Sequence, residues 1–369
     1  GIMEMLFAIS TPSQSVLPSL ACGDLSPAAG AGALLANLHC DLDLGRYSLM
    51  NTRFWNSFSD DWQANCLAWQ HCPANPVVPP GQPAWKSRWT ANPHFFELEG
   101  RLLLAYRGNG EVPHRPGELH DRIAIAEVLS IGPEGLSIRD LNGGSFAIDC
   151  GAVGEFDDQE ALDPAPALFK GQVWLYYSAV GTGQPDSLGL ATSPDGEHFT
   201  KRGQVMVGRA PTALVRGERL YMAYQLQDEQ GNYVPVLAST EDGFHFEPVG
   251  DGQIRGLILP GTWASLSVGT MRLYDDGDWA YLLYGGSSYL ADEPDFFGLA
   301  RSKDLLNWEQ HPGNPIFGCG PKGAADGGAI WSAACIEREG GFALVHEGSP
   351  GKYSWALDSH ICLSWLKKG

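Results

Sequence analysis

A unit of three short segments recurs along most of the chain. Each unit has a short apolar segment, a glycine turn, an aromatic-rich segment that ends in a small residue, and a third segment that reads roughly GLAxSxDGxxF. Apolar and aromatic runs of this length, separated by glycine turns, are typical of β-hairpins, so each unit predicts three antiparallel strands. Self-similarity of this kind predicts a repeat architecture. The first two strands of the five units are expected at residues 92–108, 163–179, 210–225, 265–286 and 329–348.

The ends of the units predict how the repeat closes. Turns such as Pro194-Asp-Gly196 and Glu241-Asp-Gly243 follow the third strand, and this hairpin chemistry predicts a fourth, outer strand. The last unit stops at its third strand, whereas residues 67–78 resemble residues 307–317, which follow the third strand of the fourth unit. We therefore expect the N-terminal segment to supply the missing outer strand, which leaves no free sheet edge.

The predicted fold class is all-β. We expect a five-bladed β-propeller at residues 61–369, with the N-terminal segment completing the last blade, and an N-terminal extension at residues 1–60. A β-sandwich or two stacked β domains are the alternative. The regular order of three hairpin-connected strands in each unit argues against them, because a Greek-key sandwich does not produce that order.

Composition excludes several kinds of partner. The 369 residues include 24 Lys and Arg against 43 Asp and Glu, and the net charge of −19 repels nucleic acids and anionic membrane surfaces. We therefore expect no nucleic acid and no membrane as partner. The eight cysteines lack CxxC spacing, and the sequence has neither a glycosylation sequon nor the basic region of a signal peptide. The expected location is the cytoplasm.

Candidate site residues follow from the geometry of a propeller. The innermost strand of each blade lines the central channel, and side chains of several blades converge where these strands begin. Polar or aromatic residues at those points are therefore candidates for a binding site. They are Asn92, Asp163, Arg209, Trp263 or Ser265, and Asp326 or Trp331.

Short motifs resemble those of the five-bladed propeller glycosidases, the superfamily of glycoside hydrolase families 43, 32 and 130. Residues 75–80 (NPVVPP) and 99–108 (EGRLLLAYRG) resemble the opening blade of family 130. Residues 160–165 (EALDPA) resemble its EDPR element, and residues 356–364 (ALDSHICLS) its closing strand. Residues 298–309 (GLARSKDLLNWE) are more similar to families 43 and 32. The resemblance implies an enzyme that cleaves a small-molecule or oligosaccharide glycoside in the central funnel.

The resemblance also implies roles for individual residues. Families 43 and 32 place an Asp at the start of blade one, a Glu at the start of blade three and a helper Asp in blade two; the matching residues are Asn92, Arg209 and Asp163. Only the blade-two carboxylate is kept, so family 130 is the better guide, and its acid, the Asp of EDPR, corresponds to Asp163. Arg107 stands where that family has an arginine that grips phosphate or sugar hydroxyls. We expect Asp163 to be the general acid, although an Asp-Pro pair also caps strand turns.

A second carboxylate must act as nucleophile or activate water. Glu347 is a candidate because His346 beside it could share its protons, and Asp158 is another. These two complete the predicted catalytic set with Asp163, while Asp326 and Asp358 are assigned to substrate binding. The acids near predicted channel ends are Asp157, Asp158, Asp326, Glu347 and Asp358.

The departures from family 130 favour a hydrolase over a phosphorylase. Its second arginine is replaced by Tyr224-Gln225, and the Arg of EDPR by Ala165, so the phosphate clamp is incomplete. No metal or nucleotide motif is present, so no metal site and no cofactor are predicted, although some relatives hold calcium or sodium in the channel. Either sugar stacking or packing between blades explains three tryptophans at inner-strand starts: Trp89, Trp263 and Trp331.

A second function stays open. With Asn92 and Arg209 where families 43 and 32 keep acids, the propeller could have lost glycosidase chemistry. It would then bind a carbohydrate without cutting it, or catalyse a proton-transfer or cyclisation step in the same pocket. A protein-interaction propeller is less favoured, because WD and kelch signatures are missing.

Overall fold

The computed structural model describes residues 49–112, 114–289, 292–351 and 359–368. All the described residues belong to one compact unit, residues 44–369. Strands dominate the described residues, as predicted; the α-helices among these residues are the short α2 (Thr52–Trp55) and α3 (Trp62–Leu67). None of the described helices is long and apolar enough to cross a membrane.

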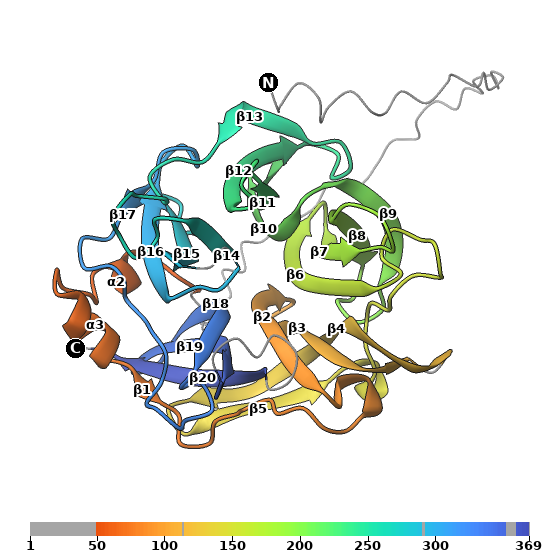
Figure 1. The fold of residues 1–369 in the computed structure, drawn as a ribbon, viewed down its shortest axis with the longest axis horizontal. Coiled ribbons are helices and arrows are strands. Elements are labelled where there is room, and N and C mark those ends of the chain that lie inside the picture. The colour runs from red at the N-terminus through yellow and green to blue at the C-terminus, as the bar shows by residue number, and fades with distance from the viewer. Residues whose placement is uncertain (1–48, 113, 290–291, 352–358, 369) are drawn as a thin grey trace, which may run out of the picture. The chain divides into compact units, whose positions relative to one another are not determined.

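The strands pair antiparallel with their neighbours in the sequence (Figure 1). Three sheets have four strands, and an eight-stranded sheet consists of two such groups, which one parallel pair, Asp121 with Glu160, joins. The first two groups are β2 (Trp89–Leu98), β3 (Arg101–Val112), β4 (Arg115–Gly132) and β5 (Gly135–Asp140), then β6 (Glu160–Phe169), β7 (Gln172–Val180), β8 (Ser187–Ser193) and β9 (Thr200–Val207). The next two are β10 (Arg209–Arg216), β11 (Arg219–Gln227), β12 (Tyr233–Thr240) and β13 (Glu247–Gln253), then β14 (Ser267–Asp275), β15 (Ala280–Ser287), β16 (Phe296–Ser302) and β17 (Glu309–Gln310).

The last sheet is completed from the N-terminal side, as the sequence predicts. It contains β18 (Ala329–Arg338), β19 (Gly341–Ser349) and β20 (His360–Lys367), and β1 (Gln70–His71) pairs with the outer edge of β20. Asn75 extends this contact, because its amide donates to the carbonyl of Leu363 (3.0 Å) and accepts from the Leu363 N–H (2.7 Å).

The first strands of the groups form a ring. β2 contacts β6, β6 contacts β10, β10 contacts β14, β14 contacts β18, and β18 contacts β2. These strands lie innermost in Figure 1, and the later strands of each group lie outside them. Side chains at the starts of the first strands of different groups are therefore brought together, as the predicted site requires.

Each first strand carries a bulge at the same place. Pairing with the second strand slips between Ala91 and His94, and again at the corresponding points of β6, β10, β14 and β18. The slip leaves two residues unpaired, and Asn92 and Asp163 take a positive φ of 49° there. Bulges re-aim side chains and are common beside active sites. The unpaired residues are Asn92-Pro93, Asp163-Pro164, Ala210-Pro211, Gly269-Thr270 and Trp331-Ser332.

The aspartate-glycine turns before the outer strands lock neighbouring groups together. Gly243 has a φ of +88°, and a Cβ there would lie 2.1 Å from the Trp174 ring of the preceding group. Only glycine fits both the conformation and this approach. Asp242 holds the turn, because its Oδ1 accepts from the N–H groups of Phe244 (2.7 Å) and His245 (2.8 Å).

Aromatic side chains fill the space between sheets. Tyr176 of β7 is buried and meets Phe246 of the next group at 5.7 Å, ring centre to ring centre. Phe54 of α2 is fully buried against Phe342 of β19, with the ring centres 5.0 Å apart. Part of the extension predicted at residues 1–60 thus packs into the core; residues 1–48 lie outside the described part.

Candidate functional site

Asp163 lies at the bulge of β6, on the inner side of the ring. It is 3% exposed, and among the described residues its Oδ2 has no hydrogen-bond partner. His94 of β2 supports this bulge, because its ring N–H donates to the carbonyl of Pro164 (2.8 Å). Burial, with Arg272 nearby, lowers the pKa of His94, so the ring stays a neutral donor. A buried carboxylate oxygen without a partner marks a place for a ligand or water.

Arg107 links two carboxylates beside Asp163. Its Nε lies 3.7 Å from Asp121 Oδ1, and its Nη2 lies 3.5 Å from Glu347 Oε1. Asp121 also accepts from the indole N–H of Trp89 (2.8 Å). The contacts join β2, β3, β4 and β19, so the first and the last group of strands meet here.

Two further arginines complete the cluster. Arg209 of β10 donates to the hydroxyl of Tyr233 (2.5 Å), and its Nη2 lies 3.4 Å from Asp292 Oδ2. Arg272 of β14 is buried, and its Nη1 donates to the carbonyl of Met271 (2.8 Å). Its Nε and Nη2 also reach the carbonyl of Pro93, the residue after Asn92 (3.4 and 3.3 Å).

Burial and mutual repulsion raise several pKa values in this cluster. Burial, with the charge of Asp121, raises the pKa of Glu160 to about 7. Burial also raises the pKa of Asp121 and Glu347, and Arg107 opposes both shifts. A carboxyl group that titrates near neutrality can hold a proton for transfer, which is what a general acid requires.

Most of the predicted site residues belong to this cluster. The backbone N–H of Asn92 donates to Glu347 Oε2 (3.3 Å), and Trp331 donates its indole N–H to the carbonyl of Asp292 (3.1 Å). Trp89 and Trp331 are both partly exposed there, as a sugar-stacking surface requires. The cluster thus brings together Asp163, Glu347, Asn92, Arg107, Arg209, Trp89 and Trp331.

Strand register corrects the position assigned to Arg209. The residue at the bulge of β10 is Ala210, with a φ of 47°, whereas Arg209 is still paired with Gln225. Ala210 is therefore the counterpart of Asp163, and Arg209 stands one residue earlier. Sequence reasoning missed this because the register of a bulge depends on the neighbouring strand.

Two other predicted residues lie elsewhere. Asp158 is buried in the loop before β6, where it accepts from the N–H groups of Gly154 (2.8 Å) and Thr182 (2.8 Å). The hydrogen bond from Gly154, with those from Thr182, lowers the pKa of Asp158 to about 2, so this carboxylate serves the loop. Trp263 packs beside Tyr284, 5.4 Å between ring centres, which is the packing alternative rather than sugar stacking.

Asp326 lies outside the arginine cluster. It interacts with His71 and His346. Burial raises the pKa of Asp326, but the hydrogen bonds with the two histidines outweigh burial and hold this pKa below its usual value. Asp358 falls outside the described residues.

Four members of the cluster were not predicted from the sequence. Asp121 and Glu160 had a weak signal, since Asp121 lies in the triplet His120-Asp-Arg122 and Glu160 opens the EALDPA motif. Asp292 and Arg272 had none, because nothing near them in the sequence marks a strand start. The unpredicted residues are Asp121, Glu160, Arg272 and Asp292.

A groove of about 1210 Å³ lies at the opposite end of these strands. The turns at residues 168–171 and 215–219 line it, together with Glu241 and Asp242. Glu241 pairs with Arg219, and Asp242 is held by its own turn. This groove is therefore not where the cluster's chemistry would act.

The pKa of Glu160 gives a testable pH dependence. Asp121 and Asp163 disfavour its charge, and Arg107 and Arg209 favour it. Because the folded-state pKa lies above the ordinary 4.5, wild-type stability falls as pH rises from about 4.5 to 7. Glu160→Gln lacks this loss, so its unfolding free energy should exceed that of wild type by up to about 3 kcal/mol above pH 7 and match it near pH 4. Urea melts across this pH range measure the difference.

The matched control is Glu134→Gln, on an exposed turn. Its difference from wild type should stay near zero at every pH. A Glu160→Gln difference that does not change with pH would contradict a raised pKa.

Comparison with known proteins gives the fold. No family model matches the sequence, and no curated protein matches it significantly. A candidate glycosidase from Bacteroides thetaiotaomicron aligns with a TM-score of 0.59 at 17% identity, over 84% of this chain and 99% of that one. The fold is that of the propeller-type glycosidases.

Two more structures of this kind agree. The β-1,2-mannobiose phosphorylase of Listeria innocua, in complex with β-1,2-mannobiose, aligns with a TM-score of 0.58 at 15% identity, over 81% of this propeller chain and 96% of its own. A β-xylosidase aligns with a TM-score of 0.55 at 11% identity, over 77% of this chain and 94% of the xylosidase chain. The resemblance drawn from the short motifs is thereby confirmed for the fold, and identities this low show the fold alone.

Proposed function

We propose that this propeller is a glycoside hydrolase in which Asp163 is the general acid. The observation that carries the proposal is the environment of Asp163: a buried carboxylate on the inner ring, with one free oxygen, among four other carboxylates and three arginines. Glycoside cleavage needs an acid on one side of the scissile bond and a second carboxylate on the other.

The proposal includes a five-bladed propeller. The eight-stranded sheet counts as two blades, since a single residue pair joins its halves. Five bulges, one in each first strand, support the same count. The blades meet at the ring that holds Asp163.

Glu347 is the proposed base. It lies on β19, faces Arg107 at 3.5 Å and accepts from the hydroxyl of Ser359 (2.5 Å) and from the N–H of Asn92 (3.3 Å). Burial raises the pKa of Glu347, and these donors oppose that shift and favour the ionised carboxylate, which a base must be. Glu160, with its pKa of about 7, keeps a proton close to Asp163.

The state of the arginines favours water over phosphate as the attacking group. Arg107 forms ion pairs with Asp121 (3.7 Å) and Glu347 (3.5 Å), Arg209 forms one with Asp292, and Arg272 donates to backbone carbonyls. A phosphorylase needs guanidinium groups that are available to the phosphate. Carboxylates also outnumber arginines here, so we expect an uncharged glycoside as substrate.

A panel of nitrophenyl glycosides with and without phosphate tests the proposal. Since the aligned structures include a β-1,2-mannobiose phosphorylase and a β-xylosidase, β-mannosides and β-xylosides come first. Release without phosphate is the expected result. Release only with phosphate would assign a phosphorylase, and no release from any glycoside would reject the enzyme.

One observation favours a second function. The bulge positions of the first and third blades hold Asn92 and Ala210, where an acid could have stood. A propeller of this kind could bind a carbohydrate without cleaving it, or catalyse another reaction in the same pocket. Saturable binding of a mannoside that is never hydrolysed would establish this alternative.

A further inference from the structure

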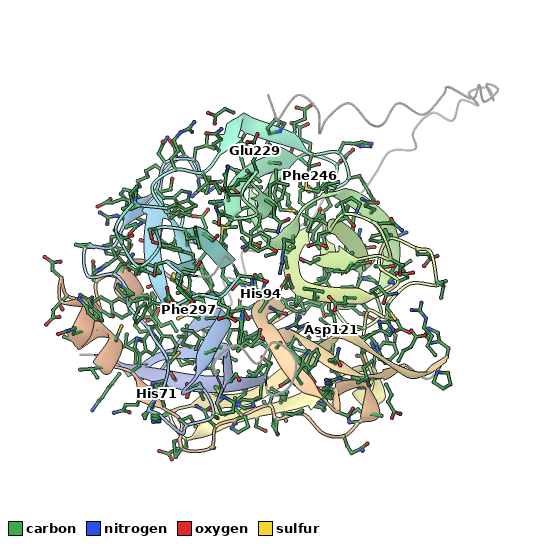
Figure 2. All side chains as sticks on the ribbon, viewed as in Figure 1. His71, His94, Asp121, Glu229, Phe246 and Phe297 are labelled. Atoms are coloured by element: carbon green, nitrogen blue, oxygen red, sulfur yellow. The ribbon has the colours of Figure 1, made fainter. Side chains whose placement is uncertain are left out.

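His71, Asp326 and His346 meet inside the last blade, away from the arginine cluster. Asp326 Oδ2 lies 2.8 Å from His71 Nδ1 and 2.9 Å from His346 Nε2, and the three atoms all lie within 4.8 Å of one another. His71 comes from β1, His346 from β19, and Asp326 from the loop before β18. Figure 2 shows His71 towards the rim of the ring, whereas His94 lies near its centre.

The counterpart of Asp326 in the second blade is Asp157, which pairs with a lysine side chain. The N–H of Gly151 donates to the carbonyl of Asp157 (2.9 Å), as the N–H of Gly320 does to that of Asp326 (3.0 Å), so the two loops turn alike. Asp157 Oδ2 accepts from the ammonium of Lys201 (2.6 Å). In the last blade two imidazoles take the place of fixed cationic partners, so the buried carboxylate there is neutralised only by a proton or an added cation.

The carboxylate of Asp326 is closely packed, and one of its two oxygens has no hydrogen-bond partner among the described residues. Asp326 is fully buried, and its Oδ1 has no hydrogen-bond partner among the described residues. A Cβ on Gly320 would lie 2.1 Å from this oxygen, so glycine is required beside it. The carboxylate thus has a fixed position, and its Oδ1 is a second oxygen that can ligate the same cation.

We propose that His71, Asp326 and His346 bind one Zn²⁺ ion that fastens the N-terminal strand β1 to the last blade. Two imidazole nitrogens and a carboxylate oxygen are a donor set that zinc prefers. The side chain of His71 is 21% exposed, whereas those of the other two are buried, so the open position faces the His71 side. Small movements bring the three atoms to bonding distance around one ion.

The neighbouring groups suit a structural site. His346 Nδ1 faces the carbonyl of Leu344 at 3.4 Å, the kind of outer contact that orients a ligating imidazole. β1 is only two residues long, so its pairing with β20 alone is weak. No local motif predicts the site, because its ligands lie at positions 71, 326 and 346 of the sequence.

Metal binding is tested on the full chain, stripped with a chelator and dialysed. After addition of Zn²⁺ and gel filtration, elemental analysis should find about one zinc per chain, and the Tm should rise by several degrees. Asp326→Asn and His71→Gln should each lower zinc retention at least tenfold. Because Asp326→Asn removes a buried charge and could fail to fold, the partly exposed His71→Gln keeps the test decisive.

The matched control is Asp157→Asn, which removes the corresponding carboxylate in the second blade. It should lose stability but retain about one zinc per chain. Wild-type protein that retains no zinc, or a folded His71→Gln variant that retains as much as wild type, would overturn the proposal. Metal content and Tm are read without a glycoside, so failure here is independent of the proposed hydrolase.

Discussion

Asp163→Asn is expected to lower kcat by about 10²–10⁴-fold and to leave the Tm within a few degrees of wild type. The amide cannot donate a proton to a leaving oxygen. The fold should tolerate the change because Asp163 Oδ2 has no hydrogen-bond partner among the described residues, so the substitution breaks no hydrogen bond at this oxygen. Nitrophenyl release and a thermal melt on the same preparation measure both quantities.

Asp158→Asn is the matched control for this prediction. Its carboxylate accepts from the N–H of Gly154 and the N–H and hydroxyl of Thr182, so the variant should lose about 1–3 kcal/mol of stability. Turnover by the folded fraction should stay close to wild type. The reverse pattern, with turnover lost at Asp158 and kept at Asp163, would move the acid to the loop.

Arg107→Met is expected to give the largest loss of stability. Without the guanidinium between them, Asp121 and Glu347 must each hold an unpaired charge in a buried site or take up a proton. Removing one partner of a buried pair costs about 3–5 kcal/mol, and substrate turnover should disappear with the geometry of Glu347. Urea unfolding at pH 7 gives the free energy.

The pH dependence of this loss has a definite sign. Arg107 lowers the pKa of Asp121 against the effect of burial, so the ion pair stabilises the protein only where Asp121 is ionised. As pH falls and Asp121 takes up a proton, the difference between wild type and Arg107→Met should shrink. Arg101→Met, at the other end of β3, removes one hydrogen bond to the carbonyl of Asp195 and should cost far less at every pH. Equal losses in the two variants would contradict a role for the ion pairs.

Local pattern predicted much of this fold. Strand alternation, glycine turns and aspartate-glycine turns act over a few residues, so the hairpins and the β-class were predictable. The likeness between residues 67–78 and 307–317 was enough to place β1 on β20. Asp163 was predictable because it stands in a short motif at a strand start.

The partners of Asp163 were less predictable. Arg107 and Glu347 both lie in the cluster around Asp163, yet nothing in the sequence says that they touch, because they are 240 positions apart. Asp158 and Trp263 stand at plausible positions, but backbone donors and a tyrosine ring engage them instead. Arg209 was placed at a bulge that belongs to Ala210, since one residue of register cannot be read from one strand.

The sequence by itself determined a repeating all-β chain and one acid, Asp163, at the start of an inner strand, because turn and strand preferences are local. Tertiary structure decided which charges surround that acid and which histidines meet Asp326. Such contacts depend on the ring of first strands and on the register of each bulge, and both arise only when distant segments pack together.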